Sequence, residues 1–196
     1  VGRPMSMAAV EAALATEEKE IIVVTQRDAT IEEPTQDDLH TIGTKAVIKK
    51  MSRQGDILEL IVHGSERVAV LRILKRNKYL QARVRPFPVP TDKSTETEAL
   101  RREVIALATR VHKLARPESQ DDFESFLNNA DDPIRLAYLL GSIGNLELEK
   151  EQALLEAPSV GDALRFMFAH LRHEVQVLEL RDKIASAAKD EMDKQQ

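Results

Sequence analysis

The stretch that most constrains the fold runs from Thr41 to Val84, where apolar and β-branched runs follow one another closely. Four such runs occur, at residues 44–49, 57–62, 67–73 and 79–84. Three turn sequences separate them: Arg53-Gln54-Gly55-Asp56, His63-Gly64-Ser65 and Arg76-Asn77-Lys78. Strand-like runs punctuated by Gly, Asn and Asp every ~8–12 residues are typical of an antiparallel meander. The pattern therefore predicts consecutive antiparallel strands in this part of the chain.

Side-chain alternation within these runs predicts how the strands are buried. In the last run, Leu80, Ala82 and Val84 alternate with polar residues, which predicts one buried face and one wet face. Residues 57–62 alternate poorly, and we expect that strand to be covered on both faces. Prolines at positions 86, 88 and 90 then end the sheet, because proline lacks the backbone donor of a ladder. Residues 86–93 are predicted to form a stiff linker.

The residues before the meander predict a short lead-in. Residues 4–15 are rich in alanine, the strongest helix former, and favour a helix. Residues 21–26 form a short apolar run that is typical of a buried strand. Residues 28–40 are polar and acidic without periodicity, and we expect a loop there.

From Ser94 onward the apolar residues recur with a period near 3.6, which predicts helices. Thr95 and Glu98 have the spacing of a capping box, and Pro117 ends the helix that begins there. We expect further helices starting at Ser119, at Asp132-Pro133 and at Glu147. The longest helix is predicted over residues 159–196, with an inward stripe that comprises Val160, Leu164, Met167, Leu171, Val175 and Leu178. Beyond Ile184 this helix has little to bury and is expected to project.

The charge distribution supports two domains. Residues 1–90 carry a net charge of +2 and residues 91–196 a net charge of −7, which together make the −5 of the whole chain. The change in charge coincides with the change from strand-like to helix-like pattern. The fold is therefore predicted as α+β, with a β-rich domain over residues 1–90 and an all-α domain over residues 91–196.

Composition and motifs exclude several classes of function. The chain has no cysteine, which excludes a disulfide framework, a thiol nucleophile and a cysteine–zinc site. No run approaches ~18 apolar residues, so we expect no membrane-spanning helix. The closest approach to a phosphate-binding loop is Gly43-Thr44-Lys45, which leads into a strand. With no nucleotide-binding loop and no serine–lysine dyad predicted, the chain is expected to be non-catalytic and to hold no cofactor.

Three groups of polar residues are candidate sites. His170 and His173, with Glu174 beside them, have metal-ligand spacing, but a helix-boundary position is the favoured interpretation and no metal is predicted. The carboxylate pairs at 121–122 and 131–132 are interpreted as helix caps. A nucleic-acid surface is the alternative to a solvated sheet face for the basic residues of the meander, which are Lys45, Lys49, Lys50, Arg53, Arg72, Lys75, Arg76, Lys78, Arg83 and Arg85. Their only aromatic partner is Tyr79, which favours the solvated face.

Several motifs, in order and together covering the chain, resemble the N-terminal region of the Lon ATP-dependent proteases. In the N-terminal half they are Val1-Gly2-Arg3, Ile22-Val23-Val24-Thr25-Gln26-Arg27-Asp28-Ala29, Ile42-Gly43-Thr44-Lys45-Ala46-Val47-Ile48 and Val62-His63-Gly64-Ser65-Glu66-Arg67-Val68. In the helical half they are Asp132-Pro133, Arg135-Leu136-Ala137, Glu151-Gln152-Ala153-Leu154-Leu155-Glu156 and Leu178-Glu179-Leu180-Arg181-Asp182-Lys183-Ile184. In that family a proline-rich strand precedes Val-Gly-Arg, and this sequence does not include it. That departure from the family pattern leaves closure of the barrel, and the strand edge beside it, as open questions at this point.

The resemblance implies a PUA-like β-rich pseudo-barrel followed by a helical bundle and a long helix. It further implies recognition of unfolded or misfolded polypeptides, support for a homo-oligomeric ring (a hexamer in the family) and a cytoplasmic location. ATP and Mg²⁺ would belong to a motor domain outside these residues. No membrane partner is expected, and nucleic acid is not the expected partner. A stand-alone Lon-domain adaptor or substrate receptor and a PUA-like RNA-binding module are the alternative functions.

Peptide capture needs exposed apolar surface near a groove, and four residues are predicted to supply it. Met5 and Met7 offer adaptable thioethers near the N-terminus, while Tyr79 and Phe87 lie near the junction of sheet and linker. The alternative for each is ordinary packing in the core.

Overall fold

The predicted meander is the centre of a four-stranded antiparallel sheet in the order β1-β2-β3-β4. The strands are β1 (Glu20–Val23), β2 (Ile42–Gln54), β3 (Ile57–Arg76) and β4 (Tyr79–Pro86). Helix α1 (Pro4–Leu14) precedes them, and a short 3₁₀ helix η1 (Gln36–Asp38) lies in the predicted loop. The computed structural model describes residues 1–76, 78–89 and 91–194, and these divide into two compact units, Val1–Pro88 and Val89–Gln196. The sequence-based division lies between residues 90 and 91.

The turn predicted at His63-Gly64-Ser65 is wrong, because β3 continues through it as one long strand. Gly64 pairs with Ala46 and Glu66 with Lys45, so Ser65 is an extra residue in β3. The Ser65 hydroxyl donates a hydrogen bond to the carbonyl oxygen of Lys45 at 3.1 Å. Such bulges bend a strand without ending it. The glycine and serine that looked like a turn therefore mark a bend.

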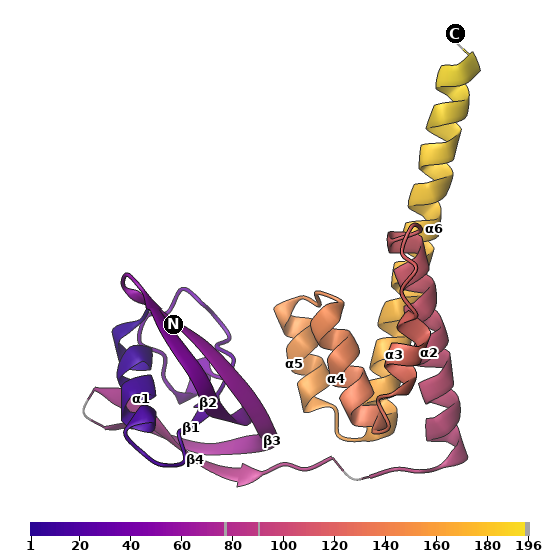
Figure 1. Ribbon diagram of the computed structural model, residues 1–196. Coiled ribbons are helices and arrows are strands. Elements are labelled where there is room, and N and C mark those ends of the chain that lie inside the picture. The colour runs from indigo at the N-terminus through magenta and orange to yellow at the C-terminus, as the bar shows by residue number, and fades with distance from the viewer. Residues whose placement is uncertain (77, 90, 195–196) are drawn as a thin grey trace. The chain divides into compact units, whose positions relative to one another are not determined.

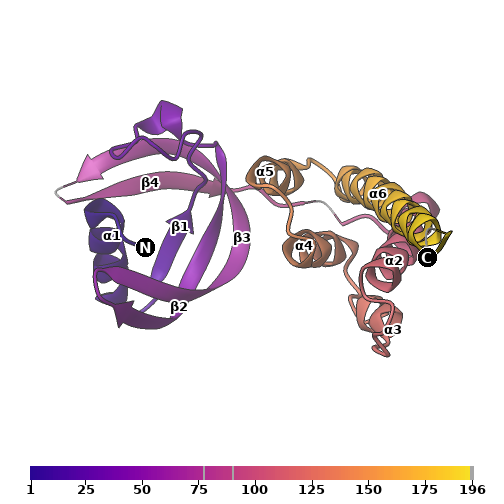
Figure 2. The ribbon, with the colours of Figure 1, turned by 90° about the horizontal axis from the view of Figure 1, so that it is seen from above.

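Three such irregularities curl the sheet into a half-barrel. Besides the one at Ser65, register shifts fall between Ile48 and Lys50 and between Val70 and Arg72. Figure 2 shows the strands bending around one side, with α1 against the curled sheet. Val10 and Ala13 of α1 pack with Ile48 of β2 and Leu58 of β3 to form the core of this unit.

Burial along the strands confirms one prediction and overturns another. Leu80, Ala82 and Val84 are more buried than the residues between them, as the alternation in β4 predicted. The strand at residues 57–62 is not covered on both faces. Leu58 is 3% exposed, whereas Ile57 is 54% and Ile61 is 61% exposed. The helix that covers this hairpin lies on one face only, so apolar residues of the other face remain in solvent.

The second unit is made of helices α2 (Thr95–Ala115), α3 (Phe123–Asn128), α4 (Pro133–Ile143), α5 (Leu148–Glu156) and α6 (Val160–Lys194). Its core includes Val104, Leu127, Leu136, Leu164 and Met167, each fully buried. The predicted stripe of α6 is buried from Val160 to Val175 and half-buried at Leu178. The last two residues of the predicted helix lie outside the described residues.

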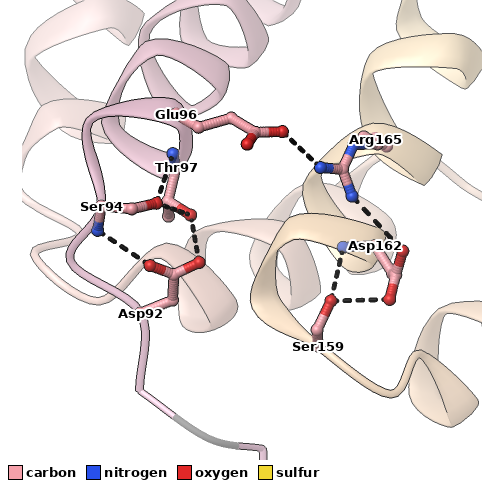
Figure 3. Close-up of polar contacts among 7 residues, drawn as sticks. All are labelled: Asp92, Ser94, Glu96, Thr97, Ser159, Asp162 and Arg165. Carbon is pink, nitrogen blue, oxygen red and sulfur yellow. Dashed lines mark hydrogen bonds and ion pairs between the residues drawn. The ribbon is translucent and has the colours of Figure 1, made fainter.

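Side-chain caps fix the N-terminal ends of α2 and α6 (Figure 3). Ser94, not Thr95, is the N-cap of α2 and accepts a hydrogen bond from the Thr97 amide at 3.2 Å. Asp92 accepts from the Ser94 amide at 2.8 Å and from the Thr97 hydroxyl at 2.6 Å. At α6, Ser159 accepts from the Asp162 amide at 3.0 Å. The predicted capping box was one residue out because Ser and Thr are both good caps.

Aspartate side chains cap the N-terminal ends of the shorter helices α3 and α4. Asp132 with Pro133 starts α4, as predicted, and its carboxylate accepts from the Ile134 amide at 3.1 Å. The helix does not start at Ser119, but the carboxylate pair at 121–122 does supply a cap, as predicted: Asp122 caps α3 by accepting from the Ser125 amide at 3.1 Å. The hydrogen bonds that the Ser125 side chain and amide donate to Asp122 lower the pKa of its carboxyl.

Helices α2 and α6 run parallel, side by side (Figure 1). Glu96 pairs with Arg165, and Arg110 pairs with Glu179, so both ion pairs join residues 69 positions apart. The shared offset shows a single parallel register along the seam. Because α2 ends at Ala115, α6 continues beyond it, and its last turns are exposed.

Candidate functional site

The β-rich unit holds an apolar hollow of about 1010 Å³ within its curled sheet. Residues from α1, β1, β3, β4 and the loop before β2 line it. Among them are Met5, Ile21, Val23, Val62, Ile73 and Tyr79. Val23 is 47% and Val62 is 41% exposed, so apolar side chains of the wall face solvent. A hollow of this kind suits an apolar ligand or an extended apolar segment of polypeptide.

Side-chain hydrogen bonds hold the loop at the border of the hollow. Arg3 donates to the Gln26 side-chain oxygen at 2.8 Å and to the Ile31 carbonyl at 2.9 Å. Gln26 in turn donates to the Ile31 carbonyl at 2.6 Å. Glu32 and Pro34 of the same loop line the hollow. The loop therefore has fixed partners at both Arg3 and Gln26 and forms part of the wall.

Charged groups at the border are partly neutralised by one another. Glu20, which lines the hollow, pairs with Lys45 at 3.0 Å. The hydrogen bond between Glu20 and Lys45 is the main reason that the pKa of Lys45 is raised. Arg83 also lines the hollow, from β4. The wall is thus apolar, with charges at its margin.

One strand edge beside the hollow is open among the described residues. The Val1 amino group donates to the Leu58 carbonyl at 2.7 Å, and the Leu58 amide donates to the Val1 carbonyl at 2.8 Å. This is the pattern of an antiparallel ladder pair. From Glu59 to Glu66, the described residues pair β3 only with β2.

The structure brings together two of the four residues that were predicted to contact substrate. Met5 and Tyr79 line the hollow from α1 and β4. Met7 packs against the core cluster around Val10 and Leu58. Phe87 lies under the Arg67 guanidinium, 4.3 Å from ring centroid to carbon. A binding role for these residues stays a prediction.

Sequence reasoning missed Val23 and Val62 as exposed members of the wall. Both lie in runs whose apolar character indicated buried strands. Period and composition report that a residue is apolar, but not whether a neighbouring strand covers it. The exposure of Val23 and Val62 therefore depends on tertiary structure, and it becomes visible only in the folded, open sheet.

The described residues contain no group of three or more His, Asp or Glu side chains that could hold a metal ion. Burial lowers the pKa of His170 despite the nearby Glu174 carboxylate.

Ser186 and Lys189 do have the spacing of a serine–lysine dyad, a pair that sequence reasoning overlooked. Both are exposed on α6, whereas an activated lysine nucleophile or base is desolvated. None of the helices in the part of the chain that the structure describes is long and apolar enough to cross a membrane.

Comparisons with known proteins agree with this geometry. The family profile of the ATP-dependent protease La (LON) substrate-binding domain matches residues 1–173. The chain is 43% identical over its whole length to a Lon protease of Nitrosococcus oceani and 30% identical to the Lon protease of Escherichia coli, of which it covers 25% in each case. The N-terminal domain of a Mycobacterium avium complex Lon protease has the same fold, with a TM-score of 0.69 at 23% identity over 86% of this chain and 85% of that one. The chain thus spans about a quarter of the length of the relatives it matches.

Proposed function

This chain belongs to the family of Lon substrate-binding domains, and we propose that it captures exposed apolar segments of unfolded or misfolded polypeptides. The single observation that carries the proposal is the apolar hollow of about 1010 Å³ in the β-rich unit. Folded proteins bury their apolar segments, so a solvent-accessible apolar surface distinguishes unfolded from folded chains. The chain would bind substrate, and catalysis would belong to other parts of a longer protein.

The exposed side chains of the wall give the sharpest test of this proposal. Val23→Ser together with Val62→Ser removes apolar surface from the hollow, and because both residues are only partly buried the fold should tolerate the change. The matched control is Ile143→Ser with Leu148→Ser, which are 47% and 51% exposed in the helical unit. Binding is measured by fluorescence anisotropy with labelled, permanently unfolded casein.

We expect the Val23/Val62 variant to bind casein much more weakly and the control to bind as the parent does. Removing two partly exposed Val side chains at about 1 kcal/mol each corresponds to roughly thirtyfold in affinity. Equal binding by the parent and both variants would place capture outside the hollow. No binding by the parent would remove substrate capture by this chain altogether.

Support for a ring assembly is the second part of the proposal, and α6 motivates it. Leu180 and Ile184, which are 58% and 61% exposed, lie on the face of α6 opposite the buried stripe, because helical residues advance by about 100° each. Their four-residue spacing suits contact with another helix. Leu180→Glu with Ile184→Glu should lower the molar mass measured by light scattering if copies associate here. A monomeric parent chain would remove this claim.

The remaining expectations stay predictions. ATP and Mg²⁺ would act in a motor domain of the longer protein, and the location would be the cytoplasm. A stand-alone adaptor would lack that motor domain, and the gene sequence beyond Gln196 distinguishes the two functions.

A further inference from the structure

Three arginines of the β-rich unit lie together on the exposed face of β3 and β4. Arg72 and Arg83 are directly opposite each other in the ladder, and Arg85 follows two residues along β4. Directly opposite residues on one face have Cβ atoms about 4.5–5.5 Å apart, and residues two apart on a strand are about 7 Å apart. All three side chains are exposed. We call Arg72, Arg83 and Arg85 the arginine patch.

The arginine patch has no counter-charge within the part of the chain that the structure describes. Other basic residues of this unit do have one: Lys45 pairs with Glu20 and Glu66, and Lys75 pairs with Glu33. No ion pair joins Arg72, Arg83 or Arg85 to any described carboxylate. No acidic residue occurs between Glu66 and Asp92, so a counter-charge would have to come from another part of the chain, as Glu33 does for Lys75. Like charges directly opposite in a ladder destabilise a sheet, so the fold gains nothing from this arrangement.

The arginine patch adjoins both an exposed apolar side chain and the hollow. Leu71 is the extra residue at the bulge next to Arg72 and is 49% exposed. Arg83 lines the hollow as well as belonging to the patch. A ligand that lay in the hollow and extended past Arg83 would therefore meet guanidinium groups next. Guanidinium forks pair best with carboxylates and phosphates.

We propose that the arginine patch binds carboxylate side chains that flank an apolar segment, so that the chain prefers unfolded polypeptides with acidic residues next to apolar ones. This inference rests on the proposed function and adds a sequence preference to it. Nucleic acid is the less favoured polyanion, since the exposed neighbour at the bulge is leucine and Tyr79 is the only aromatic residue between Arg67 and Pro86.

The test uses two labelled peptides that share an apolar centre, one flanked by glutamates and the other by glutamines. Fluorescence anisotropy gives the affinity of each for the 196-residue chain, and the ratio measures the acidic preference. The test variant is Arg72→Gln/Arg83→Gln/Arg85→Gln. The control is Lys49→Gln/Lys50→Gln/Arg53→Gln, which loses the same charge from the β2–β3 hairpin, where Asp56 and Glu59 lie nearby.

We expect the parent to bind the glutamate peptide about tenfold more tightly at low salt, as three exposed ion pairs of modest strength would give. The arginine variant should lose this preference, and the control should retain it. The ratio of the two affinities is compared within each variant, because Arg83 also lines the hollow and its replacement changes the affinity for both peptides. Equal affinity of the parent for both peptides would overturn the inference, as would an equal loss in both variants. Tighter binding of a single-stranded oligonucleotide than of the glutamate peptide would also overturn it, in favour of nucleic acid.

The outcomes separate this inference from the proposed function. If the parent binds the glutamine peptide but shows no acidic preference, apolar capture stands and the arginine patch is a solvated surface. If the parent binds neither peptide, the proposed function fails as well. Circular dichroism of both variants verifies that each is folded.

Discussion

Arg67 is the only buried charged residue among those that the structure describes, at 8% exposure. Its side chain donates to the Phe87 carbonyl at 2.7 Å and to the Pro88 carbonyl at 3.5 Å, and its guanidinium stacks on the Phe87 ring. One side chain thereby satisfies backbone acceptors at the end of β4, where proline prevents further strand pairing. Phe87 therefore has a structural partner, which sequence reasoning did not provide for.

Replacing Arg67 should destabilise the β-rich unit more than replacing Phe87. Arg67→Met keeps an apolar stem but removes the charged donor, and we expect a loss of about 1.5–3 kcal/mol in unfolding free energy. Phe87→Leu keeps the bond to the backbone and should lose only about 0.5–2 kcal/mol. Urea denaturation followed by circular dichroism measures both. The reverse order would show that the ring, not the hydrogen bond, dominates.

Asp92 makes the stability of the helical unit depend on pH. Hydrogen bonds from Thr97, above all, and from Ser94 lower the pKa of its carboxyl below the ordinary value of 3.8. The stabilising contribution is therefore fully present above pH 3.8 and is lost as the pH falls through the lowered value. Asp92→Asn should lower the melting temperature at pH 7, and this difference should shrink in strong acid.

The Thr97→Val variant provides the control for Asp92. It removes the hydroxyl that donates to the carboxylate at 2.6 Å. In that background, Asp92→Asn should have a smaller effect at pH 7. A full-sized effect would mean that the carboxylate acts through the Ser94 amide or on the helix dipole, and not through Thr97.

At the scale of elements, periodicity predicted the types of most helices and strands but not the path of β3. The stripe from Val160 to Val175 is buried as predicted, because helical spacing alone fixes which residues share a face. The bulge at Ser65 was predicted as a turn, since glycine next to a polar residue occurs both in turns and in β-bulges. The pairing of Gly64 with Ala46, distant in sequence, decided between them. The hollow depends on this curl and was equally beyond local reasoning.

The contact between α4 and α5 explains a glycine in the last turn of α4. A Cβ on Gly141 would lie 2.7 Å from the Leu154 Cδ2 and 3.4 Å from the Leu146 Cδ1. Gly→Ala in a helix normally stabilises it by about 1 kcal/mol, but here overpacking should outweigh this gain. We expect Gly141→Ala to lower the unfolding free energy by about 1–2 kcal/mol, measured by urea denaturation.

Gly161 offers the matched control. The three atoms nearest to a Cβ at Gly161 all belong to the Arg165 side chain, the closest at 3.2 Å, and this flexible side chain needs to shift by only a few tenths of an ångström. Gly161→Ala should therefore be neutral or slightly stabilising. If both substitutions behaved alike, close packing would not be the reason for Gly141.

At the scale of the whole molecule, the two units differ in both fold and charge. The β-rich unit holds the hollow, the open edge of β3 and the arginine patch, and the helical unit holds the long α6. The fold class and the family were accessible from sequence because motif order and charge distribution extend over the whole chain. The four predicted contact residues were harder, since an apolar residue in a sequence is equally suited to a core and to a binding surface.

The central claim is that the hollow of the β-rich unit holds an apolar segment of an unfolded polypeptide. Amide hydrogen exchange of the chain, with and without excess permanently unfolded casein, tests it most directly. We expect slower exchange in β1, in β4 and in β3 near Val62 and Ile73, where the wall of the hollow lies. Slower exchange confined to α6, or no change anywhere in the β-rich unit while casein is bound, would contradict it.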